Sequence, residues 1–274
     1  MSIKKDASGR RLVELELEVP GTPEQVWQAI ATGAGISSWF VPTEVEGHLG
    51  GAVAFHLGEG IESFGHVTAW EPPRRFAYEE RDWLPNAPPL ASEFTIESRA
   101  GGTCVMRLVH SLFASNDEWD DQLESIESGW PTFFGILRIY LGQFAGQPCS
   151  AIRLSGRASG SEEEAWDALT STLGLAGASS GQHRQVAIAG ATPLAGVVQR
   201  IGLSKHREML VKLREPVTGA GLFGVYTWGT QVMLLITLYL YGPVAAEIAA
   251  REEPRWREWL QHTPLVERAA ASAQ

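Results

Sequence analysis

The residue of this sequence best suited to chemistry is His110, which follows Met106 and Leu108 at alternating positions. If this stretch is a strand, the three side chains share one face, and the histidine points the same way as the core-facing residues beside it. Such a histidine can hydrogen-bond a ligand or act as an acid or base near neutral pH. The structural alternative, which we favour, is a half-buried histidine bonded to neighbouring backbone or to the loop beginning at Ser111.

Other reactive combinations have weaker support. A metal site would need His56 and His66 to converge with His110, and their spacings match no zinc pattern, so we expect no metal. The acidic residues 116–121 lack the glycine and the closing glutamate of an EF-hand loop, and are typical of a solvated helix start. The glutamates at 79–80 are likewise expected to be exposed.

Signatures of nucleophilic and nucleotide-dependent enzymes are missing from the sequence. No GxSxG, Walker A, GxGxxG or HExxH motif occurs, and residues 156–160 do not keep the spacing of a nucleophile elbow. The sequence therefore argues against hydrolase, NTPase and dehydrogenase functions, and we expect no cofactor. A cyclase remains open, because it needs only a shaped cavity and one proton carrier.

Composition narrows the partners and the compartment. The 274 residues carry a net charge of −10, which disfavours nucleic acid and anionic membrane surfaces as partners. The two cysteines, Cys104 and Cys149, fit no disulfide or metal pattern and suit two free thiols in a reducing cytoplasm. The charged N-terminus precedes no apolar signal segment, and the most hydrophobic stretch, 232–241, is too short to span a membrane. We expect a cytoplasmic protein.

The elements that would position His110 can be predicted from periodicity. Residues 11–19 alternate as a half-buried strand, and Thr22 with Gln25 forms a capping box that starts a helix ending near Gly33. Five short strand-like runs separated by glycine and proline turns follow, at 52–57, 63–70, 76–82, 91–98 and 104–111. Short strands joined by tight turns predict an antiparallel meander.

A long amphipathic helix is predicted over residues 123–144. Its apolar residues recur at helical spacing and form an aromatic stripe: Ile126, Trp130, Phe133, Phe134, Leu137, Tyr140, Leu141 and Phe144. Pro131 either kinks this helix or marks its true start near Gly129. A helix with such a stripe needs an apolar sheet face to cover it.

The same order of elements begins again after residue 148. Trp27 aligns with Trp166 at an offset of 139 residues without a gap, and Ser161 with Glu164 forms a second capping box. Strand-like runs follow at 185–189, 196–201, 208–214, 221–228 and 231–241, and a helix over 243–260. This predicts a diverged duplication, with domains at 1–147 and 148–274.

The first half resembles the activator-of-Hsp90-ATPase-homologue 1-like family, within the START-like, Bet v 1-like superfamily. The matching pieces occur in order over about residues 10–145: Thr22–Trp27, Trp39-Phe40, Gly50-Gly51, Gly65-x-Val67, Glu71–Phe76, Gly102-Thr103, His110-Ser111, Gly129-Trp130 and Leu137-x-x-Tyr140-Leu141. Each piece alone is a weak signal, and their order makes it specific. The second half is similar to the superfamily only in element order.

The resemblance implies an α+β, helix-grip fold, in which a curved antiparallel sheet wraps around a long C-terminal helix and encloses a cavity. Candidate lining residues are Trp39, Phe40, Phe55, Phe64, Tyr78, Trp83, Phe94, His110, Phe113, Trp130, Phe133, Phe134 and Leu137. Any one of these aromatic residues, taken alone, is more often part of the hydrophobic core than of a ligand site. As a group they suit an apolar pocket with a few polar groups.

Three functions follow from this fold. The first is binding of a small hydrophobic or lipid-like molecule, with His110 orienting one polar group. The second is an enzyme similar to the polyketide cyclases and aromatases of the superfamily, with His110 as acid or base. The third, implied by the family name alone, is regulation of the chaperone Hsp90. The apolar strands of the second half could also form an interface between domains or within a homodimer.

Overall fold

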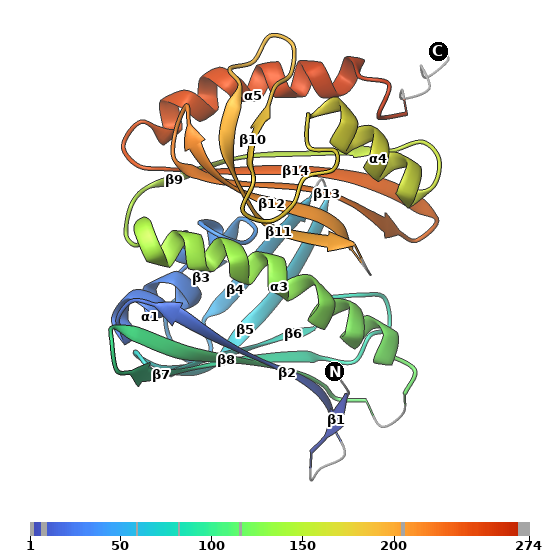
Figure 1. Ribbon diagram of the computed structural model, residues 1–274. Coiled ribbons are helices and arrows are strands. Elements are labelled where there is room, and N and C mark those ends of the chain that lie inside the picture. Colours follow the sequence, from blue (N-terminus) through green and yellow to red (C-terminus); the bar gives the residue numbers. More distant parts are fainter. Residues whose placement is uncertain are drawn as a thin grey trace. The chain divides into compact units, whose positions relative to one another are not determined.

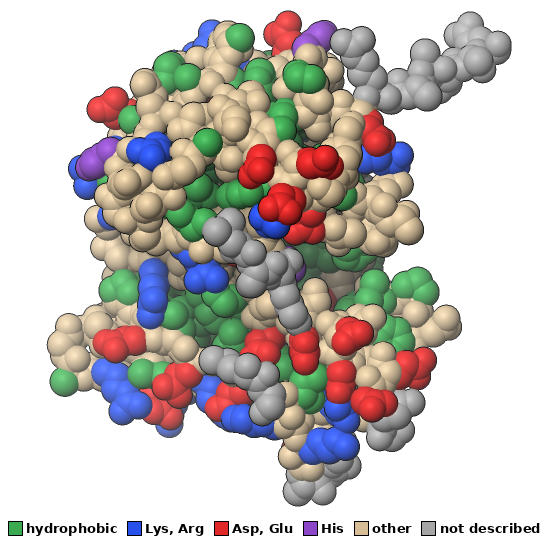
Figure 2. Space-filling view, turned by 45° about the vertical axis from the view of Figure 1, so that its right-hand side comes forward, with side chains coloured by type: hydrophobic (Ala, Val, Ile, Leu, Met, Phe, Trp, Pro, Cys, Tyr) green, Lys and Arg blue, Asp and Glu red, His purple; other side chains and the backbone are tan. Residues whose placement is uncertain are grey.

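The computed structural model describes residues 3–6, 10–58, 60–81, 83–114, 117–203 and 206–267. The chain divides into two compact units, Met1–Gly146 and Gln147–Gln274. None of the described helices combines the length and the apolar character needed to cross a bilayer. On the face visible in Figure 2, basic side chains lie close to acidic ones without forming a continuous basic patch.

Unit 1 contains one antiparallel sheet (Figure 1). In sheet order its strands are β1 (Lys4–Lys5), β2 (Arg11–Pro20), β8 (Thr103–Leu112), β7 (Leu90–Arg99), β6 (Arg75–Arg81), β5 (Ile61–Glu71), β4 (Ala52–Gly58) and β3 (Thr43–Val45). The five predicted runs between β3 and the long helix are all strands, although residue 82 lies outside the described residues. The first long strand, β2, pairs with the last, β8, so the chain returns to its starting edge.

Among the described residues of this unit, three helices accompany the sheet: α1 (Pro23–Ala31), α2 (Gly33–Ser37) and α3 (Asp120–Gln143). The predicted capping box opens α1, where the Gln25 amide donates to Thr22 Oγ1 and the Thr22 amide donates to Gln25 Oε1. Helix α1 ends at Ala31, close to the predicted stop near Gly33, and the Thr32 hydroxyl then caps the short helix α2, which was not predicted. We call the sheet face turned toward α3 the inner face.

Helix α3 begins at Asp120, within the acidic stretch expected to start a helix and three residues before the predicted stretch 123–144, and runs through Pro131. The alternative start near Gly129 is therefore wrong. Pro131 has no N–H to donate to the carbonyl of Glu127, so one hydrogen bond of the helix is missing at its centre. At the first residue of the helix, the Asp120 carboxylate accepts two hydrogen bonds from the Arg11 guanidinium at the start of β2.

Unit 2 contains a second antiparallel sheet. Its strands in sheet order are β10 (His183–Val186), β11 (Leu194–Leu203), β12 (Arg207–Glu215), β13 (Gly219–Trp228), β14 (Gln231–Tyr241) and β9 (Cys149–Arg157). Helix α4 (Glu162–Thr172) opens with the predicted Ser161–Glu164 capping box, and α5 (Ala245–His262) ends the unit. Apolar side chains fill the space between α4, α5 and the sheet.

Both units have the same topology. The first long strand pairs with the last strand (β2 with β8, and β9 with β14). A helix follows that first long strand, a meander fills the sheet, and a long helix closes the unit. After its first strand, unit 2 has five described strands where unit 1 has six. The predicted fold class, an α+β helix-grip arrangement present in two copies, is confirmed.

Candidate functional site

A row of three polar side chains crosses the inner face of the unit 1 sheet. Tyr78 on β6 lies opposite Ser92 on β7, and Ser92 lies opposite His110 on β8. All three are buried, with exposed fractions of 5%, 0% and 2%. The Ser92 hydroxyl lies 2.8 Å from His110 Nδ1 and is also hydrogen-bonded to the Tyr78 hydroxyl. Strand alternation, which places every second residue inward, brings the three together.

The second ring nitrogen of His110 is the unusual atom of this row. Nε2 is buried and has no hydrogen-bond partner among the residues that the structure describes. Burial lowers the pKa of His110 to about 3, so the imidazole is neutral at physiological pH. Nε2 is a donor when Ser92 donates to Nδ1, and an acceptor when Nδ1 donates to Ser92. In both tautomers the ring presents one unused polar atom to the interior.

A buried carboxyl group extends the row along β6. Glu80 is 8% exposed, and its Oε1 accepts a hydrogen bond of 2.5 Å from the Ser63 hydroxyl on β5. Burial raises the pKa of Glu80 to about 7, against a smaller opposing effect of the Ser63 hydrogen bond. Burial, and to a lesser extent the Glu80 carboxyl, also raises the pKa of Tyr78. The expectation that Glu80 is exposed is wrong, because Phe76, Tyr78 and Glu80 all alternate inward.

Aromatic rings from α3 and from the segment after α2 cover this polar row. The Trp130 ring is stacked on the His110 ring with centroids 5.4 Å apart, and it also contacts Phe40 at 5.1 Å and Phe134 at 5.3 Å. The cluster of mutually contacting predicted residues comprises Trp39, Phe40, Phe55, Tyr78, Phe94, His110, Trp130, Phe133 and Phe134. Leu137, one turn further along α3, is fully buried.

Three predicted lining residues lie elsewhere. Phe64 is 58% exposed, because Ser63 takes the inward position of that strand and Phe64 points to the outer face. Phe113 follows the end of β8 and is also exposed. Trp83 packs against Trp119 in a separate cluster at the start of α3, where its Nε1 donates to the Pro88 carbonyl. The predictions for Phe64 and Phe113 as interior walls are therefore wrong.

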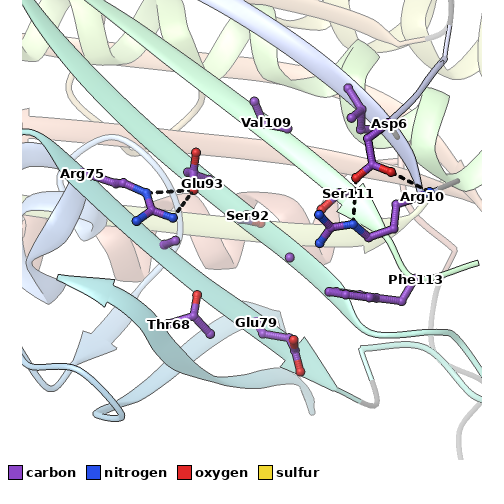
Figure 3. A pocket seen from close by; sticks show the side chains of 13 residues that line it. Asp6, Arg10, Thr68, Arg75, Glu79, Ser92, Glu93, Val109, Ser111 and Phe113 are labelled. Atoms are coloured by element: carbon purple, nitrogen blue, oxygen red, sulfur yellow. Dashed lines mark hydrogen bonds and ion pairs between the residues drawn. The ribbon is translucent and has the colours of Figure 1, made fainter. Parts of the chain in front are cut away.

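A groove of about 380 Å³ lies on the outer face of the same sheet (Figure 3). Arg75 donates two hydrogen bonds to Glu93 in it, and Arg10 donates to Asp6 and lies 5.2 Å from the Phe113 ring centroid. Glu79, which also lines the groove, pairs with Arg81, so the charged groups of this groove already have partners of opposite charge. The inner face differs, because His110 Nε2 there has no hydrogen-bond partner among the described residues.

The second unit provides an internal comparison for the polar row. The offset of 139 residues aligns Val13 on β2 with Ile152 on β9. Val13 lies opposite His110, and Ile152 lies opposite Leu238. Leu238 therefore occupies in unit 2 the position that His110 occupies in unit 1.

Following the strand register outward from this pair gives the remaining equivalents. Ser92, Tyr78, Glu80 and Ser63 correspond to Gly221, Val211, Leu213 and Leu194. None of these unit 2 residues has a polar side chain, and all are buried. The topology therefore forms without the polar row.

Residues 20–142 match the family described as "Activator of Hsp90 ATPase homolog 1-like protein". Among solved structures, the di-domain aromatase/cyclase BexL from the BE-7585A biosynthetic pathway is 14% identical, with a TM-score of 0.44, over 91% of this chain and 92% of its own. Protein MLL2253 from Mesorhizobium loti is 23% identical, with a TM-score of 0.44, over 48% of this chain and 98% of its own. The Aha1 dimer from Colwellia psychrerythraea is 18% identical, with a TM-score of 0.41, over 47% and 95%. No curated protein matches the chain.

Proposed function

We propose that residues 20–142, which match the activator-of-Hsp90-ATPase-homologue 1-like family, form a domain that binds a small, mainly apolar molecule between its sheet and α3. The observation that supports this most strongly is His110, which is buried, neutral and hydrogen-bonded at Nδ1 to Ser92, while its Nε2 has no hydrogen-bond partner in the described part of the chain. A buried polar atom without a partner carries a free-energy cost of about 1–3 kcal/mol. A ligand hydroxyl or carbonyl group at Nε2 would remove that cost.

The second unit supports a functional rather than a structural role for this polar row. Leu238 replaces His110 there within the same topology, so a helix-grip sheet of this chain does not need a histidine at that position. A buried polar group that folding does not require, in an otherwise apolar interior, fits the pattern of a ligand site. The wall consists of aromatic rings, which suit flat apolar molecules.

Entry of a ligand requires Trp130 to move, because its ring covers His110. The helix is weakest just beyond this residue, where Pro131 interrupts the hydrogen bonding. At the N-terminal end of α3, the Asp120 carboxylate is hydrogen-bonded to the Arg11 guanidinium at the start of β2. We propose that residues 120–130 form a cover that opens by bending at Pro131 and is held closed by the Arg11–Asp120 ion pair.

Asp120→Asn should therefore speed ligand entry. The asparagine keeps the helix start but loses the charge that pairs with Arg11, so the cover opens more often. We expect the association rate of 2-naphthol to rise several-fold in stopped-flow fluorescence, with a smaller change in affinity. Asp121→Asn, an exposed neighbour in the same turn, is the matched control. Equal rates in the two variants would contradict the proposed cover.

Substitution of His110 tests the proposed ligand contact. In His110→Leu, which copies the residue of unit 2, the affinity for 2-naphthol should fall about tenfold, since one hydrogen bond is worth about 1.4 kcal/mol. The affinity for naphthalene, which has the same rings and no hydroxyl, should stay within about twofold. Displacement of a fluorescent apolar probe measures both. A wild-type protein that binds neither compound would contradict the proposed function.

A cyclase-like enzyme is the second candidate. The low pKa of His110 makes its imidazole a weak base, which favours a binding role over proton abstraction by this residue. Glu80, however, has a pKa of about 7 and is suited to proton transfer near neutral pH. An activity carried by this site should follow a pKa near 7 and be lost in Glu80→Gln. Regulation of Hsp90 stays a prediction from the family resemblance.

A further inference from the structure

We infer that Glu80 and Ser63 form a second polar contact of the interior site, so that its ligand carries two uncharged oxygen groups on one apolar body. This inference rests on the proposed function and specifies its ligand class. The first oxygen group would meet His110 Nε2. The second would meet the Glu80 carboxyl.

The strand register places the two contacts apart on one face. Glu80 lies two residues beyond Tyr78 on β6, and Tyr78 is two strands away from His110. At about 4.8 Å per strand and about 3.3 Å per residue, the backbone positions of Glu80 and His110 are roughly 12 Å apart. Both side chains point to the inner face. The span suits a fused two-ring molecule better than a single small group.

The surroundings of Glu80 leave it with hydrogen-bonding capacity. Within the described part of the chain, its carboxyl has one hydrogen bond, the contact of 2.5 Å from Ser63. Its strand neighbours at this level are Gly65 on β5 and Leu90 on β7, and no described Lys or Arg forms an ion pair with it. Tyr78 is the titratable group that its charge affects. The second carboxyl oxygen is therefore open to a ligand.

The protonation of Glu80 sets the chemistry of that ligand. With a pKa of about 7, raised by burial, the carboxyl is largely neutral below neutral pH and can donate its O–H. A neutral carboxyl group pairs well with a hydroxyl or carbonyl oxygen and has no charge with which to attract a charged group. An uncharged oxygen group is thus the fitting partner. The apolar equivalents Leu213 and Leu194 in unit 2 show that the topology does not need the Glu80–Ser63 pair.

Two matched compounds test the inference on the full-length protein at pH 6. We expect wild type to bind 2,6-dihydroxynaphthalene about tenfold more tightly than 2-naphthol, as one added hydrogen bond predicts. Glu80→Leu should bring the ratio of the two affinities to about one, while 2-naphthol alone binds within about threefold of wild type. Glu80→Gln, whose amide can still donate, should keep most of the preference. The ratio is taken within one protein, so a loss of folded protein cancels.

The outcomes separate this inference from the proposed function. Wild type that binds both compounds equally, or a preference that persists in Glu80→Leu, would overturn the second contact and leave binding at His110 intact. Wild type that binds neither compound would overturn both. Circular dichroism of Glu80→Leu establishes that the variant is folded, and we expect it to be at least as stable as wild type at pH 8.

Discussion

Replacing Glu80 with glutamine should raise the free energy of unfolding by about 3 kcal/mol at pH 8.5 and leave it nearly unchanged below pH 4.5. The pKa of Glu80 is about 7 in the folded protein, against an ordinary value of 4.5. Between these two values the unfolded chain loses the carboxyl proton while the folded protein retains it. Wild type therefore loses stability from this group as the pH rises from 4.5 to 7, and above pH 7 it carries the full cost of a buried charge.

The histidine of the same row acts in the opposite direction. The pKa of His110 is about 3 in the folded protein, against an ordinary value of 6.5. Below pH 6.5 the imidazole therefore takes up a proton in the unfolded chain but stays neutral in the folded protein. The stability contributed by the neutral His110 is therefore lost as the pH falls from 6.5 toward 3. In wild type the two effects oppose each other between pH 4.5 and 6.5. Of these two effects, Glu80→Gln retains only that of His110. Its free energy of unfolding should therefore rise steeply as the pH increases from 4.5 to 6.5.

Urea denaturation at several pH values, followed by tryptophan fluorescence, measures this difference. Glu79→Gln is the matched control, because Glu79 is adjacent on the same strand and lies on the outer face with its carboxylate bonded to Arg81. If the free energies of unfolding of Glu80→Gln and wild type differ by the same amount at pH 4.5 and pH 8.5, then Glu80 does not retain its proton in the folded protein as described above.

Replacing Trp130 with alanine should have the second large effect, a loss of about 3–5 kcal/mol in stability. The ring is 7% exposed and contacts His110, Phe40 and Phe134. Its removal leaves a void over His110 and next to the weak point of α3 at Pro131. Because a two-ring aromatic molecule matches the lost side chain in size, 2-naphthol should bind this variant more tightly and restore part of its stability.

A tryptophan of the second unit is the control for this effect. Trp166 is 6% exposed and buried in the unit 2 core, so Trp166→Ala should cost a comparable amount of stability. It should not change the affinity for 2-naphthol, because it is not part of the proposed site. Thermal unfolding with and without 2-naphthol compares the two variants. Equal ligand-induced stabilisation in both would place binding away from His110.

Much of the fold could be predicted because its signals are local. The capping boxes at Thr22 and Ser161 and the alternation that turns His110 inward depend on residues within one helix turn or one strand. The short strands β1 and β3 were not predicted, because two or three residues carry no period. The start of α3 at Asp120 agrees with the acidic helix start expected over 116–121, whereas its ion pair with Arg11, 109 residues earlier in the chain, has no local signal.

The site was predicted only in part. The sequence analysis includes Tyr78 and His110 among the lining residues but not Ser63, Ser92 or Glu80, and it includes Phe64 and Phe113, which are exposed. Strand alternation, and not side-chain size or charge, decides these positions, because it turns Ser63 inward and Phe64 outward. The hydrogen bond between Ser92 and His110 joins two strands, so no single run of sequence reveals it.

The central claim, that His110 Nε2 contacts a ligand in the interior of unit 1, is tested most directly by nitrogen-15 NMR of the histidine side chains. The account predicts one histidine that stays neutral from pH 5 to 8, is absent from the spectrum of His110→Leu, and shifts at Nε2 when 2-naphthol is added. An Nε2 resonance of this histidine that does not move at saturating 2-naphthol would contradict the account.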